Sequence, residues 1–197
     1  MRNAHLLYLL IIALFLPFAA GAQQVRFFDG QYRLPGSLID RIYQDTHGNL
    51  WLTGKSGAIK YSGTTFTRQS LRYPNAPSLP LVKCMEFLDN EKIIFGTSHG
   101  MVINDCLNDT IGTLPVIIRD TVFDNCYVSS VVQCKKLGAL IVTCSGTGIA
   151  AFDLESLKPN KSLTDTLNNL INTRYPGTLS RASAFLPALT AASAAIR

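Results

Sequence analysis

Few residues in this sequence combine the type and the spacing that catalysis or metal binding requires. The three histidines, His5, His47 and His99, are isolated from one another and from the cysteines. No Cys-x-x-Cys pair occurs, so the ligand spacing typical of a zinc site is missing. Nothing in the sequence pairs two of the 13 acidic residues as glycoside hydrolysis requires. We therefore predict no metal, no cofactor and no catalytic residue, and we do not expect an enzyme.

His47 and His99 remain as candidates for ligand binding. Both occupy turn positions on or beside a glycine that recurs in the sequence. Turns at one face of a repeat protein are places where ligands bind, but solvated turn residues explain the same pattern. Asp45 begins an oxygen-rich Asp-x-x-Gly-Asn segment that lacks the full spacing of a calcium loop. We interpret Asp45 as a residue that caps its own turn.

The elements that position these residues are short strands separated by turns rich in Gly, Asp and Asn. Four strands within about 30 residues, each bounded by turn residues, predict an antiparallel meander. Two looser copies of the pattern follow. In the first copy the predicted strands are 38–43, 50–53, 58–61 and 64–68. In the second copy they are 82–87, 93–95 and 101–103, with an outer strand at 116–118 or 122–123. In the third copy they are 128–134, 139–143 and 149–152.

The copies align on Gly57, Gly100 and Gly148, at intervals of 43 and 48 residues. A period of ~40–50 residues with four strands per unit is typical of propeller blades. Trp51, Ile94 and Leu140 are expected at matching positions on strands that pack between neighbouring blades. Trp51 is then a core residue and not a sugar-stacking platform. We predict an all-β fold, a partial β-propeller of about three four-stranded antiparallel blades at 37–70, 80–123 and 126–162, within a region 23–162.

The first 22 residues have the features of a secretory signal peptide. Arg2 precedes an apolar run from Leu6 to Ala20, and the small residues Ala20-Gly21-Ala22 follow. We expect cleavage before Gln23 and an exported, periplasmic chain; an uncleaved inner-membrane anchor is the alternative.

Charge and cysteine content limit the partners and the cross-links. The formal net charge of +5 is scattered, so we expect no nucleic-acid partner. An oxidising compartment permits disulfides among the five cysteines, and their odd number leaves at least one thiol unpaired. The sequence does not indicate which cysteines pair.

The last segment, 163–197, departs from the repeat. Residues 163–170 either open another blade or form a short helix. From Gly177 onward Ala and Ser dominate, which is typical of a marginal helix or a disordered tail. A truncated or frameshifted reading frame near Tyr175-Pro176 is a further hypothesis.

The first copy resembles the two-component regulator propeller repeat. The resemblance rests on Gln44 to Gly54 followed by Gly57 to Tyr61, which contain an acidic residue, a glycine turn, a tryptophan strand, a glycine and a tyrosine. The Gly-Thr pair of the repeat is reversed to Thr53-Gly54 here and is kept as Gly96-Thr97 in the second copy. The residues that we assign to the repeat are Asp45, Gly48, Trp51, Gly57, Tyr61, Gly96, Thr97, Gly100 and Gly148.

In this family such repeats form large periplasmic propellers of hybrid two-component sensors in Bacteroides-type bacteria, which detect glycan fragments. The resemblance implies a ligand-sensing propeller fragment with an oligosaccharide ligand and no kinase core of its own. Three blades do not close a ring, so further blades from another chain or self-association would cover the open edges. Two alternatives stay open: a fragment of a propeller-type glycan hydrolase or lyase, and a truncated, non-functional gene product.

Overall fold

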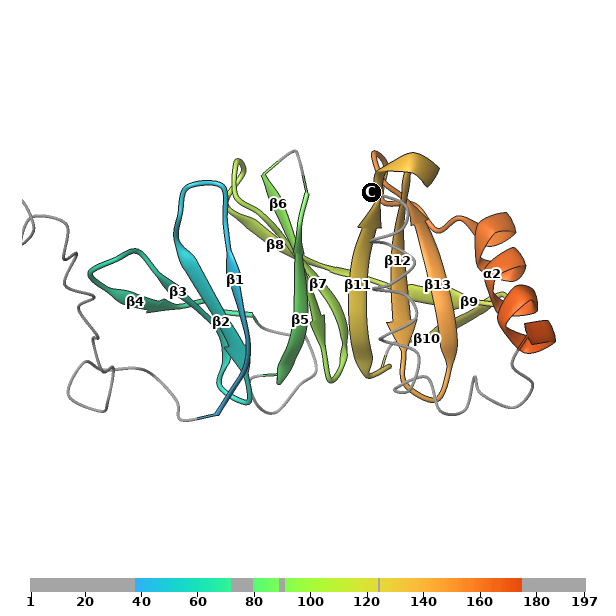
Figure 1. The fold of residues 1–197 in the computed structure, drawn as a ribbon, viewed down its shortest axis with the longest axis horizontal. Coiled ribbons are helices and arrows are strands. Elements are labelled where there is room, and N and C mark those ends of the chain that lie inside the picture. The colour runs from blue at the N-terminus through green and yellow to red at the C-terminus, as the bar shows by residue number, and fades with distance from the viewer. Residues whose placement is uncertain (1–37, 72–79, 89–90, 124, 175–197) are drawn as a thin grey trace, which may run out of the picture. The chain divides into compact units, whose positions relative to one another are not determined.

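The computed structural model describes residues 38–71, 80–88, 91–123 and 125–174. Three antiparallel sheets follow one another in the chain, with a two-stranded hairpin between the second and the third and one helix after the third (Figure 1). This arrangement confirms the all-β, partial propeller-like fold. The expected signal peptide at 1–22 and the tail from residue 175 lie outside the described residues.

The first two sheets are four-stranded meanders in the simple order of the sequence. The first contains β1 (Ile39–Gln44), β2 (Leu50–Gly54), β3 (Gly57–Tyr61) and β4 (Phe66–Arg68), and the second contains β5 (Val82–Phe87), β6 (Lys92–Thr97), β7 (Gly100–Asp105) and β8 (Thr110–Leu114). Gly57 and Gly100 begin the third strand of each sheet with φ angles of 89° and 114°. These left-handed values favour glycine, which is why the residue recurs at this point of the repeat.

The predicted outer strand of the second copy was wrong. The fourth strand of that sheet is β8, whereas β9 (Val116–Ile118) and β10 (Thr121–Phe123) pair with each other as a separate hairpin. β8 is almost fully exposed, so packing imposes no apolar alternation on its sequence. Val116 and Ile118 are apolar for another reason, since they are buried in the core of the third sheet.

The third sheet contains three strands, β11 (Val128–Cys134), β12 (Ala139–Cys144) and β13 (Gly148–Asp153), with a short 3₁₀ turn, η3 (Lys135–Leu137), between the first two. Beyond β13 the described chain makes a single bridge, Phe152 to Pro159, and then helix α2 (Lys161–Arg174). The blade expected at 126–162 therefore differs from the other two. Residues 163–170 belong to a helix and do not open another blade.

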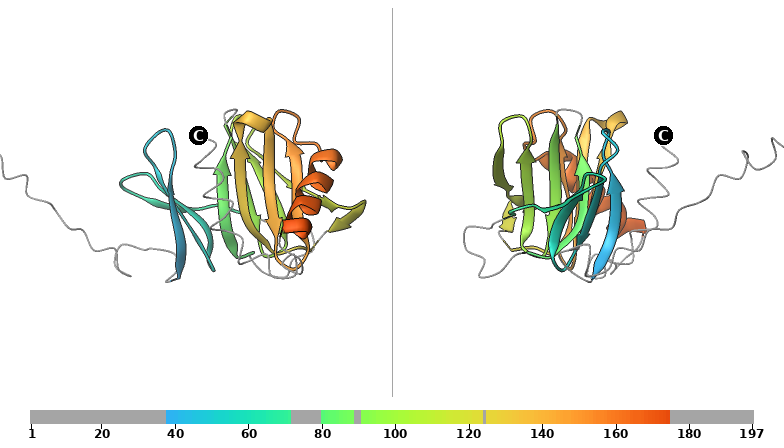
Figure 2. Two further views of the ribbon diagram at one scale, coloured as in Figure 1. Left: turned by 45° about the vertical axis from the view of Figure 1, so that its right-hand side comes forward. Right: turned by 90° about the vertical axis from the view of Figure 1, so that its left-hand side faces the viewer.

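Helix α2 lies along the free edge of β13, where a fourth strand would otherwise pair (Figure 2). Asn168 Oδ1 accepts a hydrogen bond from the Ile149 N–H at 3.1 Å, and Asn168 Nδ2 donates to the Ile149 carbonyl at 2.7 Å. One helical turn earlier, Thr164 Oγ1 accepts from the Ala151 N–H at 2.9 Å. Thr164 and Asn168 are four residues apart, a rise of ~6 Å along the helix. The backbone groups of Ile149 and Ala151 that point away from the sheet are two residues apart, ~6.7 Å along the strand. The two spacings match, so both side chains reach the strand edge.

The remaining outward-pointing groups of β13 are also paired. The Asn160 N–H donates to the Ala151 carbonyl at 2.8 Å, and Asp153 exchanges backbone hydrogen bonds with Lys158 and Leu157 at 2.9 Å each. The same Asn160 caps α2, because its Oδ1 accepts from the Leu163 N–H at 3.0 Å. The edge of this sheet is thus closed by a helix and its leading turn, with no fourth strand.

Two apolar cores join the sheets face to face. One lies between the first and second sheets and includes Trp51, Met85 and Phe95; the other lies between the second and third and includes Ile94 and Leu140. Trp51 and Ile94 both point toward the following sheet, as expected. Leu140 also packs between neighbouring sheets, as expected, but it points back toward the preceding sheet, so its alignment with Trp51 and Ile94 was wrong.

The register of the third sheet explains this correction. Gly54 pairs with Gly57 and Thr97 with Gly100 across two-residue turns, whereas Cys144 pairs with Gly148 across a three-residue turn. The extra turn residue makes Ile141 the register equivalent of Trp51. A shift of one residue along a strand moves the side chain to the opposite face.

Gly96 of the repeat has a packing role and not a conformational one. A Cβ atom there would lie 2.4 Å from Cys84 Sγ and 2.6 Å from Val128 Cγ1. Val128 begins β11, so the missing side chain lets the second and third sheets approach closely.

Candidate functional site

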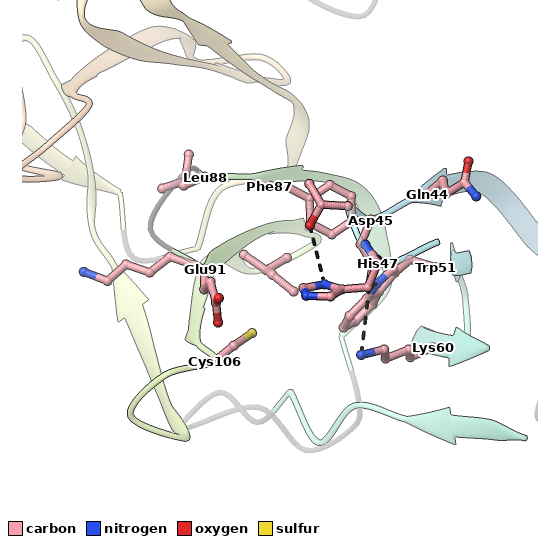
Figure 3. Close-up of a pocket in the computed structure, with 12 residues that line it drawn as sticks. Gln44, Asp45, His47, Trp51, Lys60, Phe87, Leu88, Glu91 and Cys106 are labelled. Atoms are coloured by element: carbon pink, nitrogen blue, oxygen red, sulfur yellow. Dashed lines mark hydrogen bonds and ion pairs between the residues drawn. The ribbon is translucent and has the colours of Figure 1, made fainter. Parts of the chain in front are cut away.

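A cavity of about 550 Å³ opens where turns of the first and second sheets meet (Figure 3). The β1–β2 turn supplies one side and the ends of β5, β6 and β7 supply the other. Its lining mixes aromatic, acidic and basic side chains. The lining residues are Gln44, Asp45, Thr46, His47, Trp51, Lys60, Phe87, Leu88, Glu91, Lys92, Ile93 and Cys106.

The β1–β2 turn is held by the Asp45 carboxylate, whose side chain is only 11% exposed. Oδ1 accepts hydrogen bonds from the backbone N–H groups of His47 and Asn49 at 3.0 and 2.9 Å. Oδ2 accepts from Asn49 Nδ2 at 2.9 Å and from Trp51 Nε1 at 3.0 Å. Gly48, with φ of 79°, completes the turn. Asp45 therefore caps its own turn, and its oxygens are occupied by protein donors and not directed at a ligand.

These donors determine the charge state of Asp45. Burial alone would raise the pKa of this carboxyl group, but the hydrogen bonds from Trp51, Asn49 and His47 outweigh it and hold the pKa below its ordinary value of 3.8. A carboxylate whose pKa is lower in the folded state than in the unfolded state stabilises the fold at pH values above its ordinary pKa. That contribution is lost as the pH falls through the folded-state pKa.

We expect Asp45→Asn to lower the free energy of unfolding at neutral pH by about 1–3 kcal/mol, because an amide –NH₂ would face donors in place of an accepting oxygen. Denaturant titrations at a series of pH values check this. The stability of the native chain should fall more steeply below pH 3.8 than that of the variant. Asp109→Asn, at an exposed turn position, is the control. Equal acid sensitivity of Asp45→Asn and the native chain would contradict the assignment.

Trp51 lies behind the cavity as part of the core. It is 3% exposed, and its ring meets those of Phe87 and Phe95 at centroid distances of 6.2 and 6.1 Å. Lys60 Nζ lies 5.5 Å from the ring centroid, at a cation–π distance. Little of the ring is left for a sugar to stack on, which agrees with the core interpretation.

The side chains that could reach a ligand are the charged and polar ones at the rim. His47 is exposed, and its ring nitrogen Nδ1 lies 3.4 Å from Thr46 Oγ1. Glu91 and Lys92 line the opposite side, where Lys92 Nζ approaches Asp105 Oδ2 at 3.9 Å. Figure 3 shows His47 and Lys60 facing Glu91 and Cys106 across the cavity.

Sequence reasoning found His47 and missed Lys60, Glu91 and Lys92. These residues are 13 to 45 positions away from His47 in the chain. The available signal was topological: successive turns of a meander alternate between its two ends, so the β1–β2, β5–β6 and β7–β8 turns share one end. Charged residues next to these three turns are therefore candidates for a common binding site.

His99 is not part of this cavity. It lies in the β6–β7 turn, at the opposite end of its sheet from the β5–β6 turn that lines the cavity. Its Nδ1 pairs with Ser98 Oγ at 2.8 Å, and its backbone N–H donates to Thr97 Oγ1 at 3.0 Å. The structure therefore separates the two predicted histidines.

The Gly-Thr pair of the repeat closes a turn. Thr97 Oγ1 donates to the Gly100 carbonyl at 2.9 Å and accepts from His99, so one hydroxyl bridges the β6–β7 turn. In the first sheet the reversed order moves the hydroxyl one residue earlier, onto Thr53. Thr53 Oγ1 is the one buried side-chain polar atom of the described residues without a hydrogen-bond partner. The reversal thus removes a turn contact and leaves an unpaired hydroxyl between the first two sheets.

Tyr61 and Gly148, the remaining repeat residues, also have structural contacts. Tyr61 stacks on Phe66 at a centroid distance of 4.5 Å, and its hydroxyl donates to the Gly63 carbonyl. Gly148 adopts φ of 132°, and a Cβ there would lie 2.8 Å from Asn168 Oδ1. Glycine is therefore required both by the backbone and by the helix that closes the edge.

Within the described ranges, no group of three or more His, Cys, Asp or Glu side chains is placed to hold a metal ion. The same part of the chain contains no helix with the length and apolar character that crossing a membrane demands.

No protein-family model matches the chain. No curated protein matches it either. Solved structures do: the extracellular domain of a one-component system from B. thetaiotaomicron superimposes with a TM-score of 0.55 and 13% identity, over 71% of this chain and 18% of that domain. The extracellular domain of a hybrid two-component system from the same bacterium superimposes with a TM-score of 0.53 and 17% identity. This match covers 68% of this chain and 19% of that domain.

The chain shares the fold of these extracellular domains. It spans less than a fifth of either. The fold implied by the resemblance to regulator propeller repeats is confirmed by structures whose sequences are less than a fifth identical.

Proposed function

We propose that this chain forms part of an exported, ligand-sensing β-propeller, and that its ligand is an oligosaccharide. The observation that carries the proposal is the fold shared with extracellular domains of bacterial signalling systems. The proposal includes a periplasmic location and no catalytic role for the chain itself.

The cavity beside His47 is the proposed binding site. Its volume of about 550 Å³ lies within the ~300–1,000 Å³ typical of small-molecule pockets. Charged side chains of both signs, Lys60 and Lys92 with Glu91, can donate to and accept from the hydroxyl groups of a sugar. Hydrogen bonds to charged groups are worth ~1.5–3 kcal/mol each, so a few of them would set the affinity.

Calorimetric titration of the purified full chain with a panel of plant and host oligosaccharides tests the proposal. We expect one sugar class to bind, and Lys92→Ala to weaken its affinity roughly 10- to 100-fold, from the loss of one charged hydrogen bond. Lys55→Ala is the matched control, since Lys55 is exposed in the β2–β3 turn at the opposite end of the first sheet. Absence of binding to every sugar, or equal weakening by both variants, would contradict the proposed site. Product analysis of the same mixtures would reveal the alternative, glycan hydrolysis or lysis.

The proposal also includes a partner for the open sheet faces. The three described sheets do not close a ring of the usual four to eight blades. Ile42 on β1 is 63% exposed on the face turned away from the second sheet. We propose that further blades from another chain, or a second copy, cover this face. Sedimentation of the secreted chain checks this, because a strictly monomeric species at micromolar concentration would count against a second copy.

A further inference from the structure

Three of the five cysteines, Cys84, Cys126 and Cys144, lie in one apolar core between the second and third sheets. Cys126 and Cys144 are 3% and 0% exposed, and their Sγ atoms are 3.3 Å apart. The backbone beside them is also joined, since the Ser145 N–H donates to the Tyr127 carbonyl at 2.9 Å. The hydrogen bond between the residues that follow the two cysteines therefore holds the two backbone segments, and with them the two sulfurs, close together.

We propose that Cys126 and Cys144 form an intramolecular disulfide when the chain folds in an oxidising compartment. A disulfide requires ~2.05 Å between the sulfurs, so the observed 3.3 Å separation closes by a movement of about 1.2 Å. Small side-chain rotations supply a movement of that size.

The other three cysteines are less suited to form a disulfide with Cys126 or Cys144. Cys134 lies opposite Ala139, at the end of β12 remote from Cys144, which is about 17 Å along a strand. Cys106 is exposed in the β7–β8 turn. Cys84 shares the core and is the competing partner. The odd number of cysteines is then accounted for by one pair and three free thiols.

The chemistry balances with an external disulfide as oxidant. During folding, before the core closes over the two thiols, Cys126 can ionise to the reactive thiolate. Its thiolate attacks one sulfur of a glutathione disulfide or of a thiol–disulfide oxidase, which expels the other sulfur as a thiolate. Cys144 then loses its proton and attacks the Cys126 sulfur, which breaks the mixed disulfide between Cys126 and the oxidant and expels the oxidant's remaining sulfur as a second thiolate. The two cysteines lose two electrons and two protons in total, and the oxidant gains them as two thiols.

Because both thiols are buried in the folded chain, oxidation belongs to the folding step. The bond would connect the segment that leads into β11 with the last residue of β12, across a separation of 18 residues. The third sheet, whose fourth strand is replaced by a helix, would thereby gain a covalent closure. The inference needs an oxidising compartment and is independent of sugar binding.

Refolding of the full chain in a glutathione redox buffer tests the inference. Remaining thiols are alkylated in denaturant, and the chain is digested with trypsin without reduction. Cleavage at Lys135 and Lys136 separates the peptide with Cys126 and Cys134 from the peptide with Cys144. We expect these two peptides as one disulfide-linked species in both the native chain and Cys134→Ala, and its absence from Cys126→Ala.

Thermal unfolding provides the second readout. Reduction should lower the Tm of the native chain and of Cys134→Ala by roughly 6–12 °C, from the loop-closure contribution of such a cross-link. The double variant Cys126→Ala/Cys144→Ala should show no dependence on reduction. Free thiols at both positions after oxidative refolding, or a link from Cys84 to either, would overturn the inference. Failure of sugar binding would leave these results unchanged.

Discussion

Replacing Asn168 by alanine is expected to lower the free energy of unfolding by about 2–5 kcal/mol. The side chain is buried and makes three hydrogen bonds, accepting from the Ile149 N–H and donating to the carbonyls of Ile149 and Thr164. Alanine would remove all three and leave both backbone groups of Ile149 unpaired. An orphaned buried group costs ~1–3 kcal/mol, which is more than the bond itself contributes.

The same change should also expose a sheet edge. With α2 loosened, the outward N–H and C=O groups of β13 would offer a template for another strand, a known route to aggregation. We therefore expect Asn168→Ala to show light scattering near its unfolding midpoint at protein concentrations where the native chain stays clear.

Asn169→Ala is the matched control, because it alters the same residue type at the next, exposed position of the helix. Alanine has a higher helix propensity than asparagine, so this variant should be unchanged or slightly more stable. Denaturant titration of both variants gives the comparison. Equal stabilities would show that the helix does not close the edge of β13.

Trp51→Ala is expected to lower the free energy of unfolding by about 3–5 kcal/mol, the range for emptying a large aromatic site in a core. The indole is 3% exposed between Phe87 and Phe95, in the core that joins the first two sheets. Its removal would also leave Asp45 Oδ2 without the Nε1 donor at 3.0 Å. Core packing and the β1–β2 turn would weaken together.

Trp51→Phe separates these two contributions. Phenylalanine retains much of the apolar contact and lacks the N–H donor, so we expect a loss of about 1–2 kcal/mol. Denaturant titration measures the stability of both variants, and the calorimetric sugar titration serves as a second readout. A Trp51→Ala chain of native stability that has lost sugar binding would contradict the core assignment and return Trp51 to the binding site.

The local pattern of the sequence was sufficient for most of the strands. In the first sheet, apolar strands bounded by Asp, Gly and Asn turns gave correct elements, because each turn is closed by residues within a few positions. Asp45 holds its own turn, and Gly57, Gly100 and Gly148 each begin a strand with a left-handed φ angle. The hydrogen bonds and φ angles of these turns depend on residues within the same short segment. The residue types that they require can therefore be recognised in the sequence.

The features that the sequence did not reveal depend on contacts between distant segments. β8 carries no apolar alternation because it is exposed, and 116–118 is apolar because it packs on the third sheet. One extra turn residue before Gly148 moved Leu140 to the opposite face.

The site, the closed edge and the cysteine pair were likewise decided by tertiary structure. The cavity joins Lys60, Glu91 and Lys92 with His47 only because the two sheets stack with the same turns at one end. Asn168 closes an edge 19 residues away, and Cys126 meets Cys144 across 18 residues. Local hydrogen bonds and strand alternation determine which elements form, whereas the packing of one sheet on the next determines which side chains meet.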